Sequence, residues 1–501
     1  MLESTSSTLQ MNVLEDSAPL QLAQYPAPGS WLTSASGSSG SKLAWTTTTP
    51  RNWSHWDDVW VNGYLAYDWD NVSAQLSDVN LTSGTATAIG GVPNGIYSKS
   101  RFRFLDVPEE LSGPGQYYFN RSTGNLYFWP TSTNLQLLGV TTLNDPFFWL
   151  QGVDNVRITG IDFEGSYQDG LQAWDSNGVT IDHCTVNGIG RNGIEFFSCT
   201  NSTVDSSLIT NCASEAVHLN GGQESTYTPS GNVLSNTTIT NYAQLSPSSP
   251  AVLLDGDGNT VTHNLIGTGP TAAILSTGPK ETVTYNIFQN SCTQVSDSGV
   301  VYQGTDPLAR GLDVECNWFQ GFNLNIAPNS RTTAQVCAVY LDNMLPGAMV
   351  RGNIFQNGNI GVIAGGGRDN SVLFNVFYGD TTGILLDARG TGWAYPDVTF
   401  GGSWHYLDSV KSALQSNPDY YAKTFPLAAD FLTNSPYWPV RFNASDNVCT
   451  GTTWIDYTNG TNNGSGTYNG NVLGAASSLQ AALNRVPAGY TMPSLSDIGP
   501  Q

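Results

Sequence analysis

Basic residues are scarce in this 501-residue chain, which has 18 lysines and arginines against 40 aspartates and glutamates. The formal net charge is −22, and no basic stripe is present that could displace counterions from a polyphosphate. A nucleic acid and an anionic membrane surface are therefore excluded as partners. No apolar run approaches the roughly 18 residues that suggest a membrane-spanning helix. The same excess of negative charge disfavours a polyanionic glycan and favours a neutral ligand.

Metal-site spacings are also missing from the sequence. Its seven cysteines form neither a CxxC pair nor a Cys/His pattern, so we predict no metal ligands. We expect most of these thiols to be small buried core residues, with one or two disulfides as the alternative. The opening residues MLESTSSTLQMNVLEDS lack the cationic and apolar regions of a signal peptide. Several N-x-S/T sequons, such as those at Asn71 and Asn120, nevertheless favour a secreted, extracellular protein.

A repeat runs through the middle of the chain and indicates the fold. It reads VLSNTTI from Val233, VTHNLI from Val261, VTYNIF from Val283, VECNWF from Val314, VRGNIF from Val350 and VLFNVF from Val372. The valines are 22 to 36 residues apart, which suits coils of three short strands with loops of variable length. One asparagine recurs in each copy and is expected to join a hydrogen-bonded ladder at a tight bend, namely Asn236, Asn264, Asn286, Asn317, Asn353 and Asn375. The sequence thus predicts an all-β protein, a right-handed parallel β-helix.

A second strand in each coil supplies an outward face. It reads AVLLDG from Ala251, GVVYQG from Gly299, AVYLDN from Ala338 and GILLDA from Gly383. Strand alternation puts the second and fourth residues in the core and points the third and fifth outward. We expect the following outward side chains to bind substrate: Trp174, Glu195, His218, Asp255, Gln303 and Tyr340. Aromatic, carboxylate and amide groups on one flat face suit a sugar-binding groove.

The remaining segments lack the repeat. Residues 1–150 contain Trp- and Tyr-rich stretches at 52–71 and 115–130 that are typical of β-hairpins, and we expect a β-rich accessory domain that caps the N-terminal end. The β-helix is assigned to residues 151–390. Residues 391–445 contain the most helix-like stretch of the chain and are interpreted as a partly helical late insertion. Residues 446–501 would form the last coils and a C-terminal cap.

Several stretches of the chain resemble the right-handed β-helix enzymes grouped around glycoside hydrolase family 141. The matching stretches are SDSGVVYQG at 296–304, AVYLDNM at 338–344 and AGGGRDNSV at 364–372. LAQYPAPGSW at 22–31 and GTGWAYPDVTFGGSWHYLDSV at 390–410 are also similar to that group. One departure is Asn343, which replaces a second Asp. The resemblance implies hydrolysis of plant or microbial glycans, with xylanase and fucosidase activities represented, and does not transfer a substrate.

Glycoside hydrolysis requires two carboxyl groups, one as acid and one as base or nucleophile. The resemblance points to Asp297 and Asp342, and Asp342 also faces outward by alternation. Along straight strands these two would be roughly 20 Å apart, so the loop before the strand of Asp297 would have to fold back. Asp387 is a geometric alternative, two coils from Asp342 at roughly 9.6 Å. Glu195 with His218 is the fallback acid/base pair.

Two other classes of function remain open. A polysaccharide lyase on this fold neutralises a uronate with calcium or with Arg or Lys, and the predicted outward face contains no Lys or Arg. Calcium is the one cofactor considered, held by Asp255, Asp342 and Asp387. A non-catalytic carbohydrate-binding or adhesin β-helix is the other class. We predict a secreted hydrolase of a neutral polysaccharide, xylan-like or another hemicellulose or glucan, whose partners are poly- or oligosaccharides. The sequence does not predict an oligomeric state.

Overall fold

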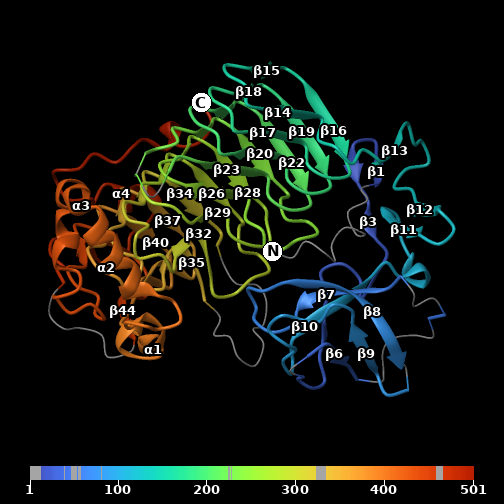
Figure 1. Ribbon diagram of the computed structural model, residues 1–501, viewed down its shortest axis with the longest axis horizontal. Coiled ribbons are helices and arrows are strands. Elements are labelled where there is room, and N and C mark those ends of the chain that lie inside the picture. The colour runs from blue at the N-terminus through green and yellow to red at the C-terminus, as the bar shows by residue number, and fades with distance from the viewer. Residues whose placement is uncertain are drawn as a thin grey trace.

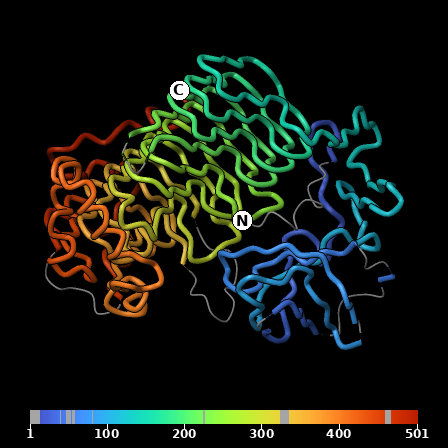
Figure 2. The backbone as a smooth tube through the Cα atoms, viewed as in Figure 1, coloured from blue at the N-terminus to red at the C-terminus, as the bar shows by residue number. Residues whose placement is uncertain are grey.

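The computed structural model of this chain describes residues 13–38, 40–46, 53–54, 58–80, 82–223, 226, 228–322, 335–458 and 466–501. Most of it is a right-handed parallel β-helix, as predicted, with an N-terminal β domain beside it and a helical insertion near its far end (Figure 1). Successive coils stack as parallel turns of the backbone (Figure 2). Three long parallel sheets, each receiving one strand per coil, build the solenoid.

The first of these sheets carries the candidate site and is called the site sheet. Its eleven strands are, in order, β14 (Phe148–Gln151), β17 (Leu171–Trp174), β20 (Ile194–Phe197), β23 (Val217–Gly221), β26 (Val252–Gly256), β29 (Ile274–Ser276), β32 (Ser298–Gly304), β35 (Val336–Asp342), β38 (Ile360–Gly365), β41 (Thr382–Asp387) and β44 (Thr453–Thr458). Each strand pairs in parallel with the strand one coil away, so residues at equivalent positions form rows along the solenoid axis.

The other two sheets meet at a sharp corner. The second contains β15 (Arg157–Thr159), β18 (Thr180–Asp182), β21 (Thr203–Asp205), β24 (Val233–Ser235), β27 (Thr260–Thr262), β30 (Thr282–Thr284), β33 (Asp313–Glu315), β36 (Met349–Arg351), β39 (Ser371–Leu373) and β42 (Asn443–Ser445). The third contains β16 (Asp162–Ser166), β19 (Thr185–Ile189), β22 (Leu208–Cys212), β25 (Thr238–Thr240), β28 (Leu265–Gly267), β31 (Ile287–Gln289), β34 (Trp318–Gln320), β37 (Ile354–Gln356), β40 (Val376–Tyr378), β43 (Val448–Cys449) and β45 (Val472–Leu473).

Buried asparagines form a ladder at this corner, as the repeat predicts. From Asn264 through Asn286, Asn317, Asn353 and Asn375, each side-chain amide donates to the Oδ1 of the next asparagine at 2.9–3.0 Å. That Oδ1 also accepts the backbone N–H of the preceding member at 2.9 Å. The ladder continues through Asn447 to Asn471. At the bend these backbone N–H groups leave the sheets, and the asparagine side chains supply the hydrogen-bond acceptors that they need.

Asn236 is not part of the ladder, and that prediction is wrong by one residue. Ser235 pairs with Thr262, so Thr237 occupies the ladder position and donates its backbone N–H to Asn264 Oδ1 at 2.9 Å. Asn236 instead takes the preceding position, where the backbone is left-handed with φ of 48°. His263 holds the same conformation on the next coil, with φ of 58°. Asn tolerates that region better than most residues, which explains why it stands there.

The interior is filled by stacked side chains of the same kind. Phe288, Phe319, Phe355 and Phe377 lie one above another, with ring centroids 4.8–5.1 Å apart. All seven cysteines are buried free thiols, so the core interpretation is confirmed and the disulfide alternative is not. None of the helices formed by the described residues has the length and apolar character of a membrane span.

The N-terminal domain contains three small sheets whose strands pair antiparallel, except that β3 and β11 pair in parallel. Its strands are β1 (Val13–Glu15), β2 (Ala18–Pro19), β3 (Gln21–Leu22), β4 (Gln24–Tyr25), β5 (Leu32–Thr33), β6 (Lys42–Ala44), β7 (Trp60–Tyr64), β8 (Val72–Asn80), β9 (Thr85–Ala88), β10 (Arg101–Leu105), β11 (Gln116–Asn120), β12 (Asn125–Trp129) and β13 (Leu138–Val140). A short 3-10 helix, η1 (Pro108–Glu110), precedes β11. The pairing of β11 with β12 confirms the hairpin predicted at 115–130, whereas β7 pairs with β8 and β10 outside the first predicted stretch.

This domain lies along the side of the β-helix rather than over its first coil (Figure 1). Its hydrogen bonds reach the loops of middle coils: Asn71 N–H donates to Ser248 Oγ at 2.7 Å, and Arg101 Nη2 donates to the carbonyl of Gln294 at 2.9 Å. On the first coil, Phe148 pairs with the core residue Leu171 and is nevertheless 38% exposed. The expected cap over the N-terminal end is therefore replaced by a lateral contact.

The late insertion is helical, as predicted. It contains η2 (Arg389–Thr391), α1 (Tyr395–Val398), α2 (Tyr406–Ser416), α3 (Pro418–Thr424) and η3 (Pro426–Asp430), and the β-helix resumes at β42. Its apolar residues pack around Met344, which follows strand β35. Asp369 forms ion pairs with Arg310 at 3.0 Å and with Arg441 at 2.6 Å, next to this packing. A short helix, α4 (Leu479–Leu483), and a 3-10 turn, η4 (Leu495–Asp497), lie in the C-terminal segment.

Candidate active site

The outward rows of the site sheet agree with the predicted alternation on all but one coil. On β35, Val339 and Leu341 point into the core while Tyr340 and Asp342 face a pocket. On β32 the register is shifted by one residue, because Tyr302 pairs with Tyr340 and Gly304 pairs with Asp342. The outward orientation predicted for Gln303 is therefore wrong. Gln303 is buried and donates to the carbonyl of Gly278 at 2.6 Å, and Tyr302 takes the place in the outward row.

The error has a physical origin in the valine pair of β32. In most coils a Gly or Ala precedes the strand, and GVVYQG was aligned on Gly299. In the structure it is Val300 that bonds Ala273 of the previous coil. Both Val300 and Val301 are buried, so apolar alternation alone does not distinguish the two registers.

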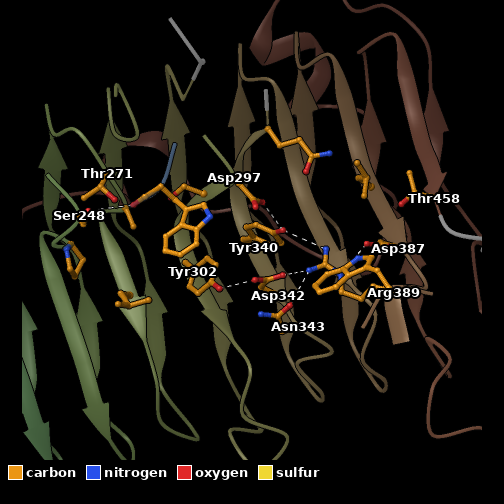
Figure 3. Close-up of a pocket in the computed structure, with 18 residues that line it drawn as sticks. Ser248, Thr271, Asp297, Tyr302, Tyr340, Asp342, Asn343, Asp387, Arg389 and Thr458 are labelled. Carbon is orange, nitrogen blue, oxygen red and sulfur yellow. Dashed lines mark hydrogen bonds and ion pairs between the residues drawn. The ribbon is translucent and has the colours of Figure 1, made fainter. Parts of the chain in front are cut away.

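A pocket of about 820 Å³ lies over the outward face of these strands (Figure 3). One end is lined by Trp69, Ser248, Pro250, Thr271, Ala272 and Leu275. Polar groups dominate the remainder, namely Asp297, Ser298, Tyr302, Gln335, Tyr340, Asp342, Asn343, Asp387, Arg389 and Thr458. Leu385 and Trp393 complete the lining. The pocket brings together all three predicted catalytic aspartates and, of the predicted binding residues, Tyr340.

Asp342 lies on the pocket floor between two hydrogen-bond donors. Tyr302 donates its hydroxyl hydrogen to Asp342 Oδ2 at 2.7 Å, and Arg389 forms an ion pair with Oδ1 (Figure 3). Little of the carboxylate is exposed, and both of its oxygens have a donor. The carboxylate is therefore held in a fixed orientation by donors on both oxygens.

Arg389 is a central pocket residue that the sequence did not predict. It follows the end of β41, where its Nε contacts Asp387 Oδ2 at 2.9 Å and its Nη2 lies 3.4 Å from the hydroxyl of Tyr340. Asp342 and Asp387 thus share one guanidinium. The predicted outward positions contain no Lys or Arg, but the pocket also includes Arg389, which lies beyond the strand end. A lone arginine two residues after Asp387, in a chain so poor in basic residues, was the available signal.

Asp297 reaches the same pocket from the turn before β32. Its backbone is left-handed, with φ of 54°, and the hydroxyl of Tyr340 donates to its Oδ1 at 3.0 Å. Burial raises the pKa of the Asp297 carboxyl, and the negative charge of Asp342 raises it further. The Tyr340 hydrogen bond and the charge of Arg389 oppose this shift only in part. The separation expected along straight strands does not apply, because a chain of contacts connects the two carboxyl groups. Asp297 contacts Tyr340, Tyr340 contacts Arg389, and Arg389 pairs with Asp342.

The two tyrosines are held as neutral hydrogen-bond donors. Burial raises the pKa of both Tyr302 and Tyr340 well above the usual range, and the neighbouring Asp342 adds to that shift. Their rings make an edge-to-face contact with centroids 5.4 Å apart. The pair therefore forms a fixed wall that orients both carboxyl groups.

The other predicted binding residues lie on earlier coils, outside this pocket. Glu195 accepts a hydrogen bond from Gln172 at 2.8 Å and lies 3.6 Å from His218 Nδ1. Trp174 stands in an aromatic row, 5.1 Å from Phe197 between ring centroids. Asp255 is held by Asn220 at 2.8 Å and by Thr277 at 2.9 Å. Within the described part of the chain, no group of three or more His, Cys, Asp or Glu is arranged to hold a metal ion.

The comparisons with known proteins agree with this fold. The family described as "Right handed beta helix region" matches residues 139–266 and 169–325. No curated protein matches the chain. A solved structure named "Glycoside hydrolase" is 11% identical with a TM-score of 0.52, covering 96% of this chain and 80% of its own.

Two further solved structures share less of the architecture. A family 87 α-1,3-glucanase from Streptomyces thermodiastaticus is 10% identical with a TM-score of 0.32, covering 97% of this chain and 98% of its own. A family 6 polysaccharide lyase from Pseudopedobacter saltans is 13% identical with a TM-score of 0.35, covering 69% and 86% respectively. At these identities the likenesses concern the fold, and the function must be argued from the site.

Proposed function

We propose that this protein is a glycoside hydrolase that cleaves a neutral polysaccharide with Asp297 and Asp342. The observation that carries the proposal is a pair of carboxyl groups in one pocket whose environments differ. Asp297 is buried with a raised pKa, whereas Asp342 is paired with a guanidinium. Glycosidic hydrolysis requires one carboxyl group that donates a proton and a second that acts as base or nucleophile.

In this mechanism Asp297 is the general acid. The proton that its raised pKa retains is delivered to the glycosidic oxygen as the bond to the anomeric carbon breaks. Asp342 then acts at the anomeric carbon, either as nucleophile or as the base that deprotonates an attacking water. Tyr302 and Tyr340 hold the two carboxyl groups in place through hydrogen bonds of 2.7 and 3.0 Å.

Asp387 is assigned a positioning role in this proposal. Asp387 Oδ2 accepts a hydrogen bond from Arg389 Nε, and this contact orients the guanidinium whose Nη1 meets Asp342. Loss of Asp387 should therefore reduce turnover less than loss of Asp342. Among the described lining residues Arg389 alone is basic, and it already serves two carboxylates. A uronate would have to compete for it, which favours a neutral substrate.

The same contacts weigh against a polysaccharide lyase. A lyase needs a base that removes a proton from the sugar, and the tyrosines of the pocket have raised pKa values. A non-catalytic carbohydrate-binding module would have no need for two carboxyl groups in different environments. The experiment below distinguishes hydrolysis from both the lyase and the non-catalytic binding module.

The test is a panel of neutral and acidic glycans, assayed for new reducing ends and for the absorbance of unsaturated uronates. Asp342→Asn and Asp297→Asn should each reduce hydrolysis by at least about 100-fold, the lower end for a lost acid or base. Asp255→Asn is the matched control, since Asp255 lies on the same face outside the pocket. Unsaturated products would establish the lyase, and full activity of Asp342→Asn would refute the proposed site.

A further inference from the structure

The pocket has an exposed tryptophan at each end, supplied from outside the β-helix. Trp69 belongs to the N-terminal domain and is 42% exposed, and Trp393 belongs to the helical insertion and is 56% exposed. Ser248, which lies next to Trp69, is at one end of the pocket, and Arg389, which lies next to Trp393, is toward the opposite end, on the side of Thr458 (Figure 3). Neither tryptophan is part of the carboxyl chemistry.

Trp69 is held in place rather than loosely exposed. Its ring is stacked on Tyr67, with centroids 5.1 Å apart and planes 7° from parallel. Its backbone carbonyl accepts a hydrogen bond from Ser248 Oγ at 3.4 Å, and the neighbouring Asp68 pairs with Arg101 at 2.9 Å. An indole fixed on one face by another ring, and open to a polar pocket, is suited to stacking on a sugar.

The same segment also fixes the loop that carries Asp297. Ser296 donates its backbone N–H to the carbonyl of Asp68 at 3.1 Å, and Arg101 donates to the carbonyl of Gln294. The N-terminal domain therefore touches the chain directly before the candidate acid. By docking there, the N-terminal domain helps to form the pocket.

The pocket runs across the strands rather than along them. Its lining residues on the strands run from Leu275 on β29 to Thr458 on β44, five strand spacings away in the site sheet. At about 4.8 Å per spacing this is roughly 24 Å along the solenoid axis. That length accommodates several linked sugars, with Asp342 on the third of these six strands.

We propose that Trp69 and Trp393 are sugar-stacking residues at the two ends of this groove, so that the glycan lies along the solenoid axis. The inference rests on the proposed function and adds the placement and minimum length of the substrate. Longer oligosaccharides contact both indoles, whereas the shortest contact only the central residues. The N-terminal domain is in this view a wall of the active site.

The experiment measures affinity separately from cleavage. A set of neutral plant and microbial oligosaccharides, graded by length, is titrated calorimetrically into the Asp342→Asn variant and into the same variant with Trp69→Ala or Trp393→Ala. Each tryptophan change should weaken binding of the longest bound members about tenfold, which is ~1.4 kcal/mol, and leave the shortest unaffected. Trp69→Phe should restore part of the affinity.

Trp129→Ala is the matched control, because Trp129 is 46% exposed on β12 and lies outside the pocket. Affinities unchanged by Trp69→Ala at every length, or weakened equally at every length, would overturn the proposal. So would a failure of all neutral oligosaccharides to bind. The proposed function fails by a different result, retained hydrolysis in Asp342→Asn, so the two failures are distinguishable.

Discussion

Replacing Asn317 by alanine tests what the asparagine ladder contributes to stability. The Asn317 amide donates to the carbonyls of Val283 and Glu315 and to Asn353 Oδ1, at 2.8, 3.1 and 3.0 Å. Its Oδ1 accepts from the backbone N–H and the side-chain amide of Asn286, at 2.9 and 3.0 Å. The side chain is fully buried, so no water replaces these partners in the folded protein.

The magnitude follows from the groups that the substitution leaves unpaired. The buried backbone N–H of Asn286 loses its acceptor, which costs about 1–3 kcal/mol. Each of the remaining hydrogen bonds contributes roughly 0.5–1.5 kcal/mol net. The lower ends of these values sum to about 3 kcal/mol, so we expect Asn317→Ala to lower the free energy of unfolding by at least that amount.

Urea denaturation followed by circular dichroism measures this loss, with Asn471→Ala as the control. Asn471 makes ladder contacts of the same kind on the last coil, where it is half-buried and water can replace them. We expect a loss of about 1 kcal/mol or less there. A loss below about 0.5 kcal/mol in Asn317→Ala, or equal losses in the two variants, would refute the ladder as a source of stability.

Three further predictions follow from buried groups. Burial raises the pKa of Asp380 to about 7, so the contribution of this carboxyl to stability should be lost as pH rises from about 4 toward 7, by roughly 4 kcal/mol at about 1.4 kcal/mol per pKa unit. The free energy of unfolding of Asp380→Asn, relative to the wild type, should therefore increase over that pH range. A difference between Asp380→Asn and the wild type that does not change with pH would contradict the buried acid. Tyr340→Phe removes a hydrogen bond that lowers the pKa of Asp297, so the alkaline limb of the activity profile should move to higher pH. A shift to lower pH would exclude Asp297 as the acid. All seven thiols are buried, so a thiol reagent should label none in the native protein and seven after denaturation, and rapid native labelling would contradict the described core.

The solenoid could be predicted from the sequence because its signals are local and repeated. Each ladder asparagine from Asn264 to Asn375 falls in the same short motif, and the motif recurs once per coil. The failures at Asn236 and Gln303 are both one-residue shifts. In each, two neighbouring residues fit the pattern equally well, and only pairing with adjacent coils distinguishes them.

The site was less predictable because much of it comes from outside the repeat. Strand alternation identified Tyr340 and Asp342, and the family resemblance identified Asp297 and Asp342. Arg389 lies beyond its strand, and Trp69 is about 230 residues before Asp297 in the chain. Only the folded chain brings these groups together, through docking of the N-terminal domain and the start of the insertion. Periodicity contains no information about such contacts.

The ladder also has a consequence for how such a protein can change over evolution. Adjacent ladder residues are separated by 22 positions between Asn264 and Asn286, by 36 between Asn317 and Asn353, and by 72 between Asn375 and Asn447. The amide-to-Oδ1 distance is nevertheless 2.9–3.0 Å in all three cases. Insertions at the other corners are thus tolerated without a change of register. New loops, whole helices and the specificity they confer can be acquired one coil at a time, while the scaffold beneath them stays the same.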